Sequence, residues 1–265
     1  MSSVANIFFS WYFRPVVNET SHSSFEQLSP DLRSVVTIGS FDGLHLGHLH
    51  LLHRCQAIAS AEDLQAWVLT FEPHPARALA PELSPPLLMG LARKQNALAQ
   101  AGFQVLAQTF DEGFARLSPD DFVRRVLGAM GAKVVVVGDD FTFGEGRLGR
   151  AEDLPALVGR HLAGRVEICE KLAVGGMIAS STRIRAFLLQ GRVDAAAALL
   201  GRDYAVAGRV ERGQGRGRTL GLPTANLCSP AELLPARGVY AGWAHLRGAS
   251  RAVLCVTNIV FNPTF

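Results

Sequence analysis

The stretch that decides the fold is residues 34–48, which read SVVTIGSFDGLHLGH. Its opening run is mostly apolar and ends at Gly39, a pattern that predicts a buried strand followed by a turn. Leucines at roughly helical spacing come next, so a helix is expected to begin directly after the turn. The free backbone N–H groups and the dipole of such a helix start form an anion site. His45 and His48 are three positions apart and therefore face the same side of this first helical turn.

The anion expected at this turn is a phosphate. Gly47 has no side chain, which lets a phosphate approach the backbone closely. The two imidazoles beside it can hold polyphosphate oxygens and stabilise the charge that develops on a transferring phosphoryl group. The same pair could also be helix-surface histidines or metal ligands, but the strand–glycine–helix setting favours the phosphate site.

Two more apolar runs predict buried strands, at residues 66–71 and 133–138. Helical stretches are expected near residues 88–101 and 119–130. Strands that alternate with helices predict right-handed βαβ units and a parallel sheet, which is the α/β class. Such sheets bind ligands at the carboxyl ends of their strands. The segments rich in chemically active side chains do follow the three strands, at residues 40–48, 72–75 and 139–149.

The C-terminal part of the sequence has a different pattern. Residues 183–200 predict a single helix that bridges two modules. Short β-like runs separated by glycine and proline follow Tyr204 and predict an antiparallel sheet or small barrel, at residues 205–210, 239–245 and 252–259. Charge supports the division, because residues 1–182 carry 15 basic and 19 acidic side chains whereas residues 183–265 carry 11 and 4. The second module is therefore expected to face anions such as phosphates.

Composition excludes several protein classes. Of the 265 residues, 48% are hydrophobic and 18% are charged, which excludes a disordered chain, collagen and a coiled coil. A net charge of +3 is too small to indicate a dedicated nucleic-acid binder. The four cysteines lack CxxC spacing, so a zinc site or disulfide framework is not indicated and a reducing, cytoplasmic location is expected. Arg14 and Pro15 interrupt the apolar start, which also lacks a basic leader, so neither a signal peptide nor a membrane anchor is expected.

Several short blocks carry a resemblance to a known family. The HxGH element at residues 45–48 resembles the signature of the HxGH nucleotidyltransferases, and the longer string GSFDGLHLGH resembles the bacterial bifunctional riboflavin kinase/FAD synthetases. Further blocks of that family match in the same order: FEPHP at 71–75, GDDFTFG at 138–144, SSTRIR at 180–185, GRTLGLPTAN at 217–226 and GVY at 238–240. Together the blocks cover about residues 34–265, and on them the chain is identified as a member of this family.

The resemblance implies an FMN adenylyltransferase module and a riboflavin kinase module, with these site residues. The catalytic residues are His45, His48 and Arg183, and ATP is bound by Gly39, Phe41, Asp42, Gly47, Ser181, Thr182 and Arg185. The flavin lies near Phe71, Pro73, His74, Asp140 and Phe143. In the kinase module Mg²⁺-ATP is held by Gly217, Thr224 and Asn226, of which Thr224 and Asn226 are the metal ligands.

The implied reaction makes FAD from ATP and FMN. The phosphate of FMN attacks the α-phosphorus of ATP in line and expels pyrophosphate, with Mg²⁺ assisting and no covalent enzyme intermediate. ATP, FMN and riboflavin are then the substrates, and neither nucleic acid nor a membrane is expected as a partner.

The resemblance also implies a domain organisation. It comprises an N-terminal extension with a first strand (1–33), a Rossmann-like nucleotidyltransferase domain (34–185), a linker helix (186–203) and an incomplete, riboflavin kinase-like antiparallel β-barrel (204–265). Because every adenylyltransferase block precedes the barrel, removal of residues 204–265 is expected to leave FAD formation intact.

Departures from the family pattern concern the kinase module. Val260 stands where the family has glycine, and the chain stops at Phe265, before the strand that carries the family's catalytic glutamate. After Asn226 the only carboxylate is that of Glu232, in a loop that does not match that position. A kinase needs a positioned base for the ribityl hydroxyl. The chain is therefore expected to make FAD from FMN but little FMN from riboflavin.

Other interpretations of the sequence remain open. GEGRLG at residues 144–149 is a literal GxGxxG and would indicate a dinucleotide-dependent oxidoreductase, but Phe143 interrupts the tight strand–glycine turn that this motif requires. A different HxGH nucleotidyltransferase, acting on pantetheine phosphate or a polyol phosphate, would leave the PTAN block unexplained. A non-catalytic flavin- or RNA-binding module would use the basic C-terminal third, although its arginines lack an aromatic platform. Arg183 and Arg185 could also be solvated helix charges, and Phe71 a core aromatic residue.

Overall fold

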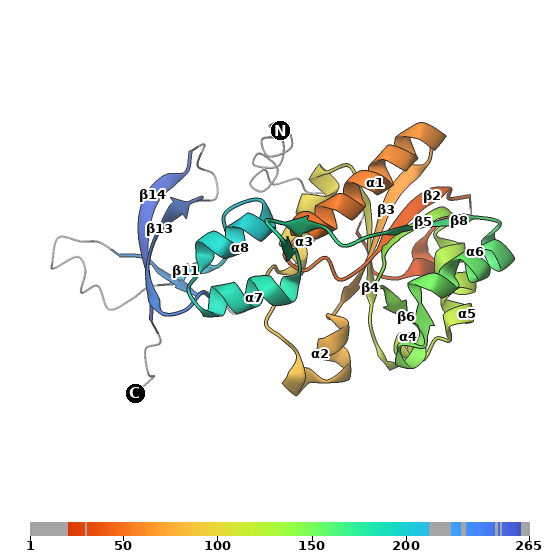
Figure 1. The fold of residues 1–265 in the computed structure, drawn as a ribbon. Helices are drawn as coiled ribbons and strands as arrows, with labels where there is room; N and C mark the ends of the chain where they lie inside the picture. The colour runs from red at the N-terminus through yellow and green to blue at the C-terminus, as the bar shows by residue number, and fades with distance from the viewer. Residues whose placement is uncertain are drawn as a thin grey trace.

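The computed structural model describes residues 21–29, 31–211, 224–228, 232–246, 249 and 251–260. Its centre is a six-stranded sheet with the strand order β1-β4-β3-β2-β5-β8, in which every pairing is parallel (Figure 1). The strands are β1 (Ser21–His22), β2 (Ser34–Ile38), β3 (Gln65–Glu72), β4 (Gln104–Thr109), β5 (Ala132–Gly138) and β8 (Arg165–Cys169). The predicted parallel sheet is confirmed, and the three predicted strands are its neighbouring central strands β3, β2 and β5.

Helices cover both faces of the sheet because successive residues of each strand point to opposite faces. In β5, Val134 and Val136 pack with α1 (Leu46–Glu62) and α3 (Leu91–Gln100), whereas Val135 and Val137 pack with α6 (Leu154–Leu162) and a π-helical turn (Phe122–Leu127). The helices are α1 (Leu46–Glu62), α2 (Pro75–Leu79), α3 (Leu91–Gln100), α4 (Glu112–Ala115), α5 (Pro119–Asp121) with the π-helical turn Phe122–Leu127, α6 (Leu154–Leu162), α7 (Ser181–Leu189) and α8 (Val193–Leu200). In the part of the chain that the structure describes, none of them has the length and apolarity that a membrane crossing requires.

The strand order determines where a ligand can bind. From β2 the chain first proceeds to β3 and β4 on one side and then returns to β5 and β8 on the other side. The carboxyl end of β2 therefore lies where the direction of winding reverses, which is the place where open α/β sheets bind their ligands. Residues 39–48 leave β2 at this point, so the fold brings the HxGH element to the expected crevice.

The C-terminal module consists of antiparallel strands, as predicted. β13 (Gly238–Ala244) pairs with β14 (Val253–Ile259), and β11 (Arg209–Glu211) pairs with β12 (Asn226–Cys228). Figure 1 shows these strands beyond α7 and α8, at the end of the molecule away from β8 and α6.

The expected helix over residues 183–200 is two helices in the structure. α7 and α8 are separated at Gly191, whose φ of +74° is left-handed and incompatible with a continuous helix. The two helices pack against each other through a separate apolar cluster that includes Ile184, Leu188 and Leu199. α7 thereby starts at the SSTRIR block itself, and its N-terminus belongs to the first module.

Gly131, directly before β5, allows a test of the fold. Its φ is +58°, and a Cβ at this position would lie 1.6 Å from the carbonyl oxygen of Leu32. We expect Gly131→Ala to lower the free energy of unfolding by about 2 kcal/mol or more, because both backbone strain and a steric clash result. Gly159 in α6 is the matched control, since a Cβ there meets nothing within 4 Å. Gly159→Ala should raise the free energy of unfolding by about 0.5–1 kcal/mol in the same urea titration.

Candidate active site

The turn between β2 and α1 is built from left-handed residues. Phe41, Gly43 and Leu44 have φ values of +49°, +83° and +42°. Phe41 and Leu44 are buried, so apolar burial stabilises a backbone shape that non-glycine residues rarely adopt. The turn delivers His45 to the N-cap position of α1. Because the Phe41 side chain is completely buried, with its ring centroid 5.2 Å from that of His48, it supports the histidine from beneath.

His45 and His48 form a stacked pair at the start of α1. Their ring centroids are 3.6 Å apart and the ring planes differ by 18°. The backbone N–H of His48 donates to Nδ1 of His45 at 3.3 Å, so a neutral His45 carries its proton on Nε2. Nδ1 of His48 is buried, and among the described residues it has no hydrogen-bond partner.

Both imidazoles are neutral at pH 7. Burial, assisted by the charges of Arg202 and Arg185, lowers the pKa of His45 to about 4. Burial also lowers the pKa of His48 well below its usual value, and electrostatic interactions with His45, Lys94 and Arg202 act in the same direction. A neutral imidazole with a defined tautomer can donate a hydrogen bond to a phosphate oxygen without giving up its proton.

Asp42 holds three segments together beneath the histidine pair. Its carboxylate, only 4% exposed, accepts the backbone N–H of Leu88 at 2.9 Å and that of Met89 at 3.0 Å. It also forms an ion pair with Arg185 of α7 at 2.5 Å. Both carboxylate oxygens are therefore engaged within the protein, and Asp42 positions the site from below.

The N-terminus of α7 meets this turn directly. The Ser181 hydroxyl donates to the carbonyl oxygen of Asp42 at 2.8 Å. Ser180 caps the helix by accepting the N–H of Arg183, while Thr182 and Arg183 are exposed. The N-terminal ends of α1 and α7 therefore converge, and two helix dipoles favour the same anion.

Gly47 and Arg185 are both closely packed or hydrogen-bonded within the protein. A Cβ at Gly47 would lie 3.1 Å from the Ala179 carbonyl oxygen and equally close to the His45 ring, so these neighbours would have to shift by a few tenths of an ångström to admit a side chain. This differs from the reason given by the sequence, which was the close approach of a phosphate. Arg185 is not a solvated helix charge, because its guanidinium group donates to the Pro86 carbonyl oxygen as well as to Asp42.

Two cationic residues of the site were missed in the sequence. Lys94 of α3 is buried, and its ammonium group donates to the Ser40 carbonyl oxygen and to the Thr70 hydroxyl, both at 2.8 Å. Arg202, just after α8, donates to the carbonyl oxygens of Gly43 and Leu44 at 2.5 and 2.9 Å. Neither residue lies in a recognisable motif, and their partners lie 24 and 54 positions away in the chain for Lys94 and 158 positions away for the bond from Arg202 to Leu44.

The predicted flavin residues line the carboxyl ends of β3 and β5. Phe71 and Pro73 are partly buried, and Phe71 forms an aromatic cluster with Phe110 and Phe114 at centroid distances of 5.6 and 5.9 Å. Phe110 and Phe114 were not among the predicted residues, since each stands alone in a polar stretch. Phe71 is thus neither a fully buried core residue nor an isolated one.

Other predicted flavin residues have partners of their own. His74 caps α2 by accepting the N–H of Ala76, and burial above all lowers its pKa. Asp140 is exposed and forms an ion pair with Lys171 at 3.1 Å. Phe143 is buried in the main core, stacked on Phe141 at 5.6 Å, so its side chain lies behind the surface that a flavin could touch.

The GxGxxG string at residues 144–149 does not form a dinucleotide-binding turn. Its first half is a short 3-10 turn, and its last glycine begins β7 (Gly149–Arg150), which pairs with β6 (Thr142–Phe143). The string therefore closes a small antiparallel hairpin, whereas a dinucleotide fingerprint must connect a parallel strand to a helix.

The kinase residues are described only in part. Asn226 opens β12 and pairs in register with Glu211 of β11, and both Thr224 and Asn226 are exposed. Gly217 lies outside the described residues. Glu232 is buried against the first module. Within the described ranges, His, Cys, Asp and Glu side chains nowhere gather in a group of three that could hold a metal ion.

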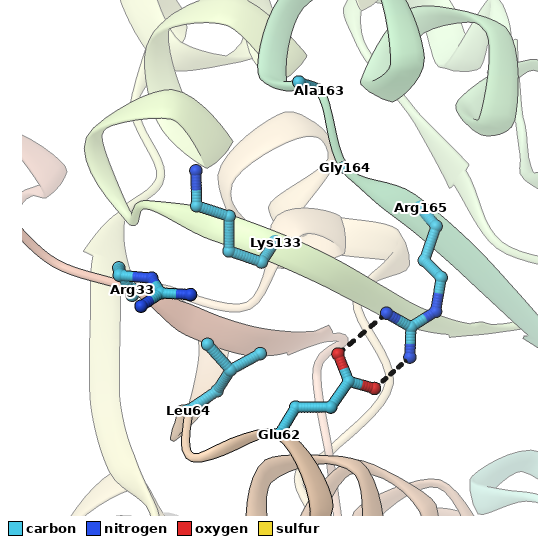
Figure 2. Close-up of a pocket in the computed structure, with 7 residues that line it drawn as sticks. All are labelled: Arg33, Glu62, Leu64, Lys133, Ala163, Gly164 and Arg165. Carbon is cyan, nitrogen blue, oxygen red and sulfur yellow. Dashed lines mark hydrogen bonds and ion pairs between the residues drawn. The ribbon is translucent and has the colours of Figure 1, made fainter.

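A hollow of about 320 Å³ opens at the opposite edge of the sheet (Figure 2). It is lined by Arg33, Glu62, Leu64, Lys133, Ala163, Gly164 and Arg165. These residues lie at the amino ends of the strands, and Glu62 already pairs with Arg165. Since parallel sheets bind ligands at their carboxyl ends, this hollow is not the active site.

Comparisons with known proteins cover almost the whole chain. A family model described as FAD synthetase matches residues 28–183, and one described as riboflavin kinase matches residues 200–265. A Bacillus subtilis protein named bifunctional riboflavin kinase/FMN adenylyltransferase is 38% identical over 238 residues, which are 88% of this chain and 73% of the relative. The Escherichia coli K12 protein of the same name is 37% identical over 80% of this chain and 68% of its own length. A Streptococcus pneumoniae crystal structure, described as a macrolide-efflux protein, superposes with a TM-score of 0.73 and 31% identity over 91% of this chain and 84% of its own.

The neutral state of His45 can be tested by titration. We expect its imidazole signals in NMR spectra to show a midpoint near pH 4, against about 6.5 for an unfolded chain. Below pH 6.5 the unfolded state takes up a proton that the folded state does not, so stability is lost as the pH falls towards 4. The loss between pH 7 and pH 5 should be about 2 kcal/mol smaller in His45→Gln than in the wild type. A wild-type midpoint near 6.5 would contradict this burial effect.

Proposed function

Since this chain belongs to the bifunctional riboflavin kinase/FMN adenylyltransferase family, we propose that the convergence of α1 and α7 is where it transfers AMP from ATP to FMN. The chain functions in FAD biosynthesis as an FMN adenylyltransferase. The observation that carries the choice of site is the neutral His45–His48 pair between two helix N-termini. Both the imidazole donors and the positive ends of the two helix dipoles suit a polyphosphate.

ATP binds with its phosphates at the two helix starts. Gly39 directly follows β2 with its N–H already donated to the Leu69 carbonyl oxygen, and the backbone at Gly47 in the first turn of α1 supplies an N–H donor. Exposed Thr182 and Arg183 supply a hydroxyl and a guanidinium group from α7. The remaining predicted ATP residues act from beneath: Phe41 packs on His48, Ser181 and Asp42 join α7 to the turn, and Arg185 pairs with Asp42.

The reaction is an in-line displacement at the α-phosphorus. A phosphate oxygen of FMN forms the new P–O bond while the bond to pyrophosphate breaks, so no group of the protein becomes covalently attached. His45 and His48 donate hydrogen bonds from neutral rings to the oxygens on which negative charge increases. Arg183 stabilises the leaving pyrophosphate, and catalysis otherwise consists of holding the two substrates in line.

FMN lies along the carboxyl ends of β3 and β5. Phe71, with Phe110 and Phe114 behind it, offers an aromatic face for the flavin ring system. Pro73 and His74 border this face, and Nε2 of a neutral His74 remains as a donor because its Nδ1 already accepts a hydrogen bond. Asp140 borders the site from β5, and Phe143 supports it from the core.

The kinase module would hold Mg²⁺-ATP through Thr224 and Asn226. Asn226 is the first residue of β12 and Thr224 lies two positions before it, and both side chains are exposed. Oxygen ligands in so small a number suit Mg²⁺, which keeps waters and substrate phosphates as its other ligands. Bound there, the ion would neutralise phosphate charge. Glu232 is not the base for the ribityl hydroxyl in this proposal, because its carboxylate is buried and engaged elsewhere.

We also propose a cytoplasmic location with small molecules as the partners, without nucleic acid or a membrane. The state of the four cysteines supports a reducing compartment, because Cys55, Cys169, Cys228 and Cys255 are all free thiols. The domain boundaries near residues 185 and 203 stay a prediction.

The experiment that tests the function separates the two reactions. The purified chain is incubated with ATP, Mg²⁺ and either FMN or riboflavin, and the products are separated by chromatography. We expect FAD and pyrophosphate from FMN. Failure to form FAD from FMN would refute the adenylyltransferase assignment, and the incubation with riboflavin measures the kinase reaction separately.

The role of His48 is tested by substitution. His48→Ala removes a ring that donates to the developing charge, so FAD formation should fall by about 10²-fold or more. His50→Ala, on the exposed side of the same helix, is the control and should retain wild-type activity. Near-normal turnover of a folded His48→Ala variant would exclude the imidazole from the transition state.

A further inference from the structure

Glu232 belongs to the segment that matches the riboflavin kinase model, yet its carboxylate is buried against the first module. One oxygen accepts the backbone N–H of Gly90 at 2.9 Å. The other accepts the Arg93 guanidinium group at 2.6 Å and the backbone N–H of Ala207 at 2.9 Å. Only 4% of the Glu232 side chain and 22% of that of Arg93 is exposed. A buried carboxylate with this many donors is held in one position, so Glu232 connects the two modules through a fixed polar contact.

Backbone contacts beside Glu232 also connect the two modules. Leu87 and Glu232 form a parallel β-bridge, and the N–H of Leu233 donates to the Leu87 carbonyl oxygen at 2.7 Å. The Tyr204 hydroxyl lies between the two segments, 2.7 Å from the Leu233 carbonyl oxygen and 3.3 Å from that of Leu88. Leu88 and Leu233 are both buried in the apolar cluster of α7 and α8. The segment around residue 232 is therefore packed as part of the first module.

Residues 87–94 of the first module, which contact Glu232, also contact the active site. The N–H groups of Leu88 and Met89 donate to Asp42, directly before the N–H of Gly90 donates to Glu232. On α3, Lys94 donates to the Ser40 carbonyl oxygen, while its neighbour Arg93 pairs with Glu232. Residues 87–94 thus lie between a carboxylate of the HxGH turn and a carboxylate of the second module.

The position and the negative charge of the Glu232 carboxylate both suit the N-terminus of α3. Gly90 is the N-cap of α3 and has no side chain to cap the helix. The Glu232 carboxylate lies at that helix start, where the dipole favours negative charge. A negative group supplied by the second module thereby fixes the beginning of the helix that carries Lys94 into the site.

We propose that Glu232 is a positioning residue for adenylyl transfer: it holds residues 87–94 from the second module and through them sets the place of Asp42, Lys94 and the His45–His48 turn. This rests on the proposed function of that turn. It also revises the expectation that residues 204–265 can be removed without effect, because their removal takes away the carboxylate to which Gly90 and Arg93 donate. The first module is expected to lose activity when cut at residue 203.

The test uses the full chain with Glu232→Gln, which keeps the size of the side chain but removes its charge. We expect kcat for FAD formation to fall by about 10-fold or more, while KM for ATP and for FMN changes little, because the reacting groups are displaced rather than the binding contacts removed. Glu232→Asp should recover part of kcat. In hydrogen exchange, the amides of Leu88 and Met89 should exchange faster in Glu232→Gln than in the wild type.

Two controls separate positioning from general stability. Leu233→Ala weakens the same packing without touching the carboxylate, and should lower Tm but leave kcat within about 2-fold of the wild type. Glu112→Gln removes an exposed ion pair with Arg116 and should change neither Tm nor kcat. If Glu232→Gln does not fold, the double variant Arg93→Gln/Glu232→Gln, which removes both buried charges, is measured against the same controls and should show the same loss of kcat.

The outcomes are distinct. Unchanged kcat and unchanged amide exchange in a folded Glu232→Gln variant would overturn the proposal, as would an equal loss of kcat in Leu233→Ala. Absence of FAD formation by the wild type would instead refute the proposed function. The exchange of the Leu88 and Met89 amides would still decide in that case whether Glu232 fixes the segment.

Discussion

The carboxylate of Asp42 is the interaction on which the active-site region depends. Burying an ionised carboxylate costs several kcal/mol unless charged and hydrogen-bonding partners replace its water. Asp42 is stable in its buried place only because two backbone amides and Arg185 meet it there. This requirement forces the end of β2, the segment before α3 and the start of α7 to converge. The N-termini of α1 and α7, where we propose that the phosphates bind, converge as a consequence.

The electrostatics of the site follow from the same packing. Lys94, Arg185 and Arg202 approach the turn from three different elements, and each donates to a backbone carbonyl or to Asp42. With so much positive charge nearby, protonation of a buried imidazole is doubly unfavourable, and His45 and His48 stay neutral. The positive potential of the proposed phosphate site thus comes from Lys94, Arg185 and Arg202 and not from a cationic imidazole.

Sequence patterns predicted those strands and site residues that depend only on residues close together in the chain. The valine runs of β2 and β5 and the spacing of His45 and His48 need only neighbouring residues, and the structure has them where the sequence placed them. β4 and β8 were missed because polar residues interrupt their apolar runs, as edge and near-edge strands allow. Lys94 and Glu232 gave no signal at all, since their roles arise from contacts across 54 and 139 positions of chain.

The boundary between the modules shows that a change in the sequence pattern need not mark the end of a set of packed residues. The change from helical to β-like sequence near Tyr204 marks where the secondary structure changes. Tyr204 itself, however, bonds to Leu88 and Leu233, and the N–H of Ala236 donates to the Leu188 carbonyl oxygen of α7. These contacts bury apolar surface and satisfy backbone groups of the first module. A cut at residue 203 would remove these partners, so the contacts of the first module extend into the second as far as Ala236.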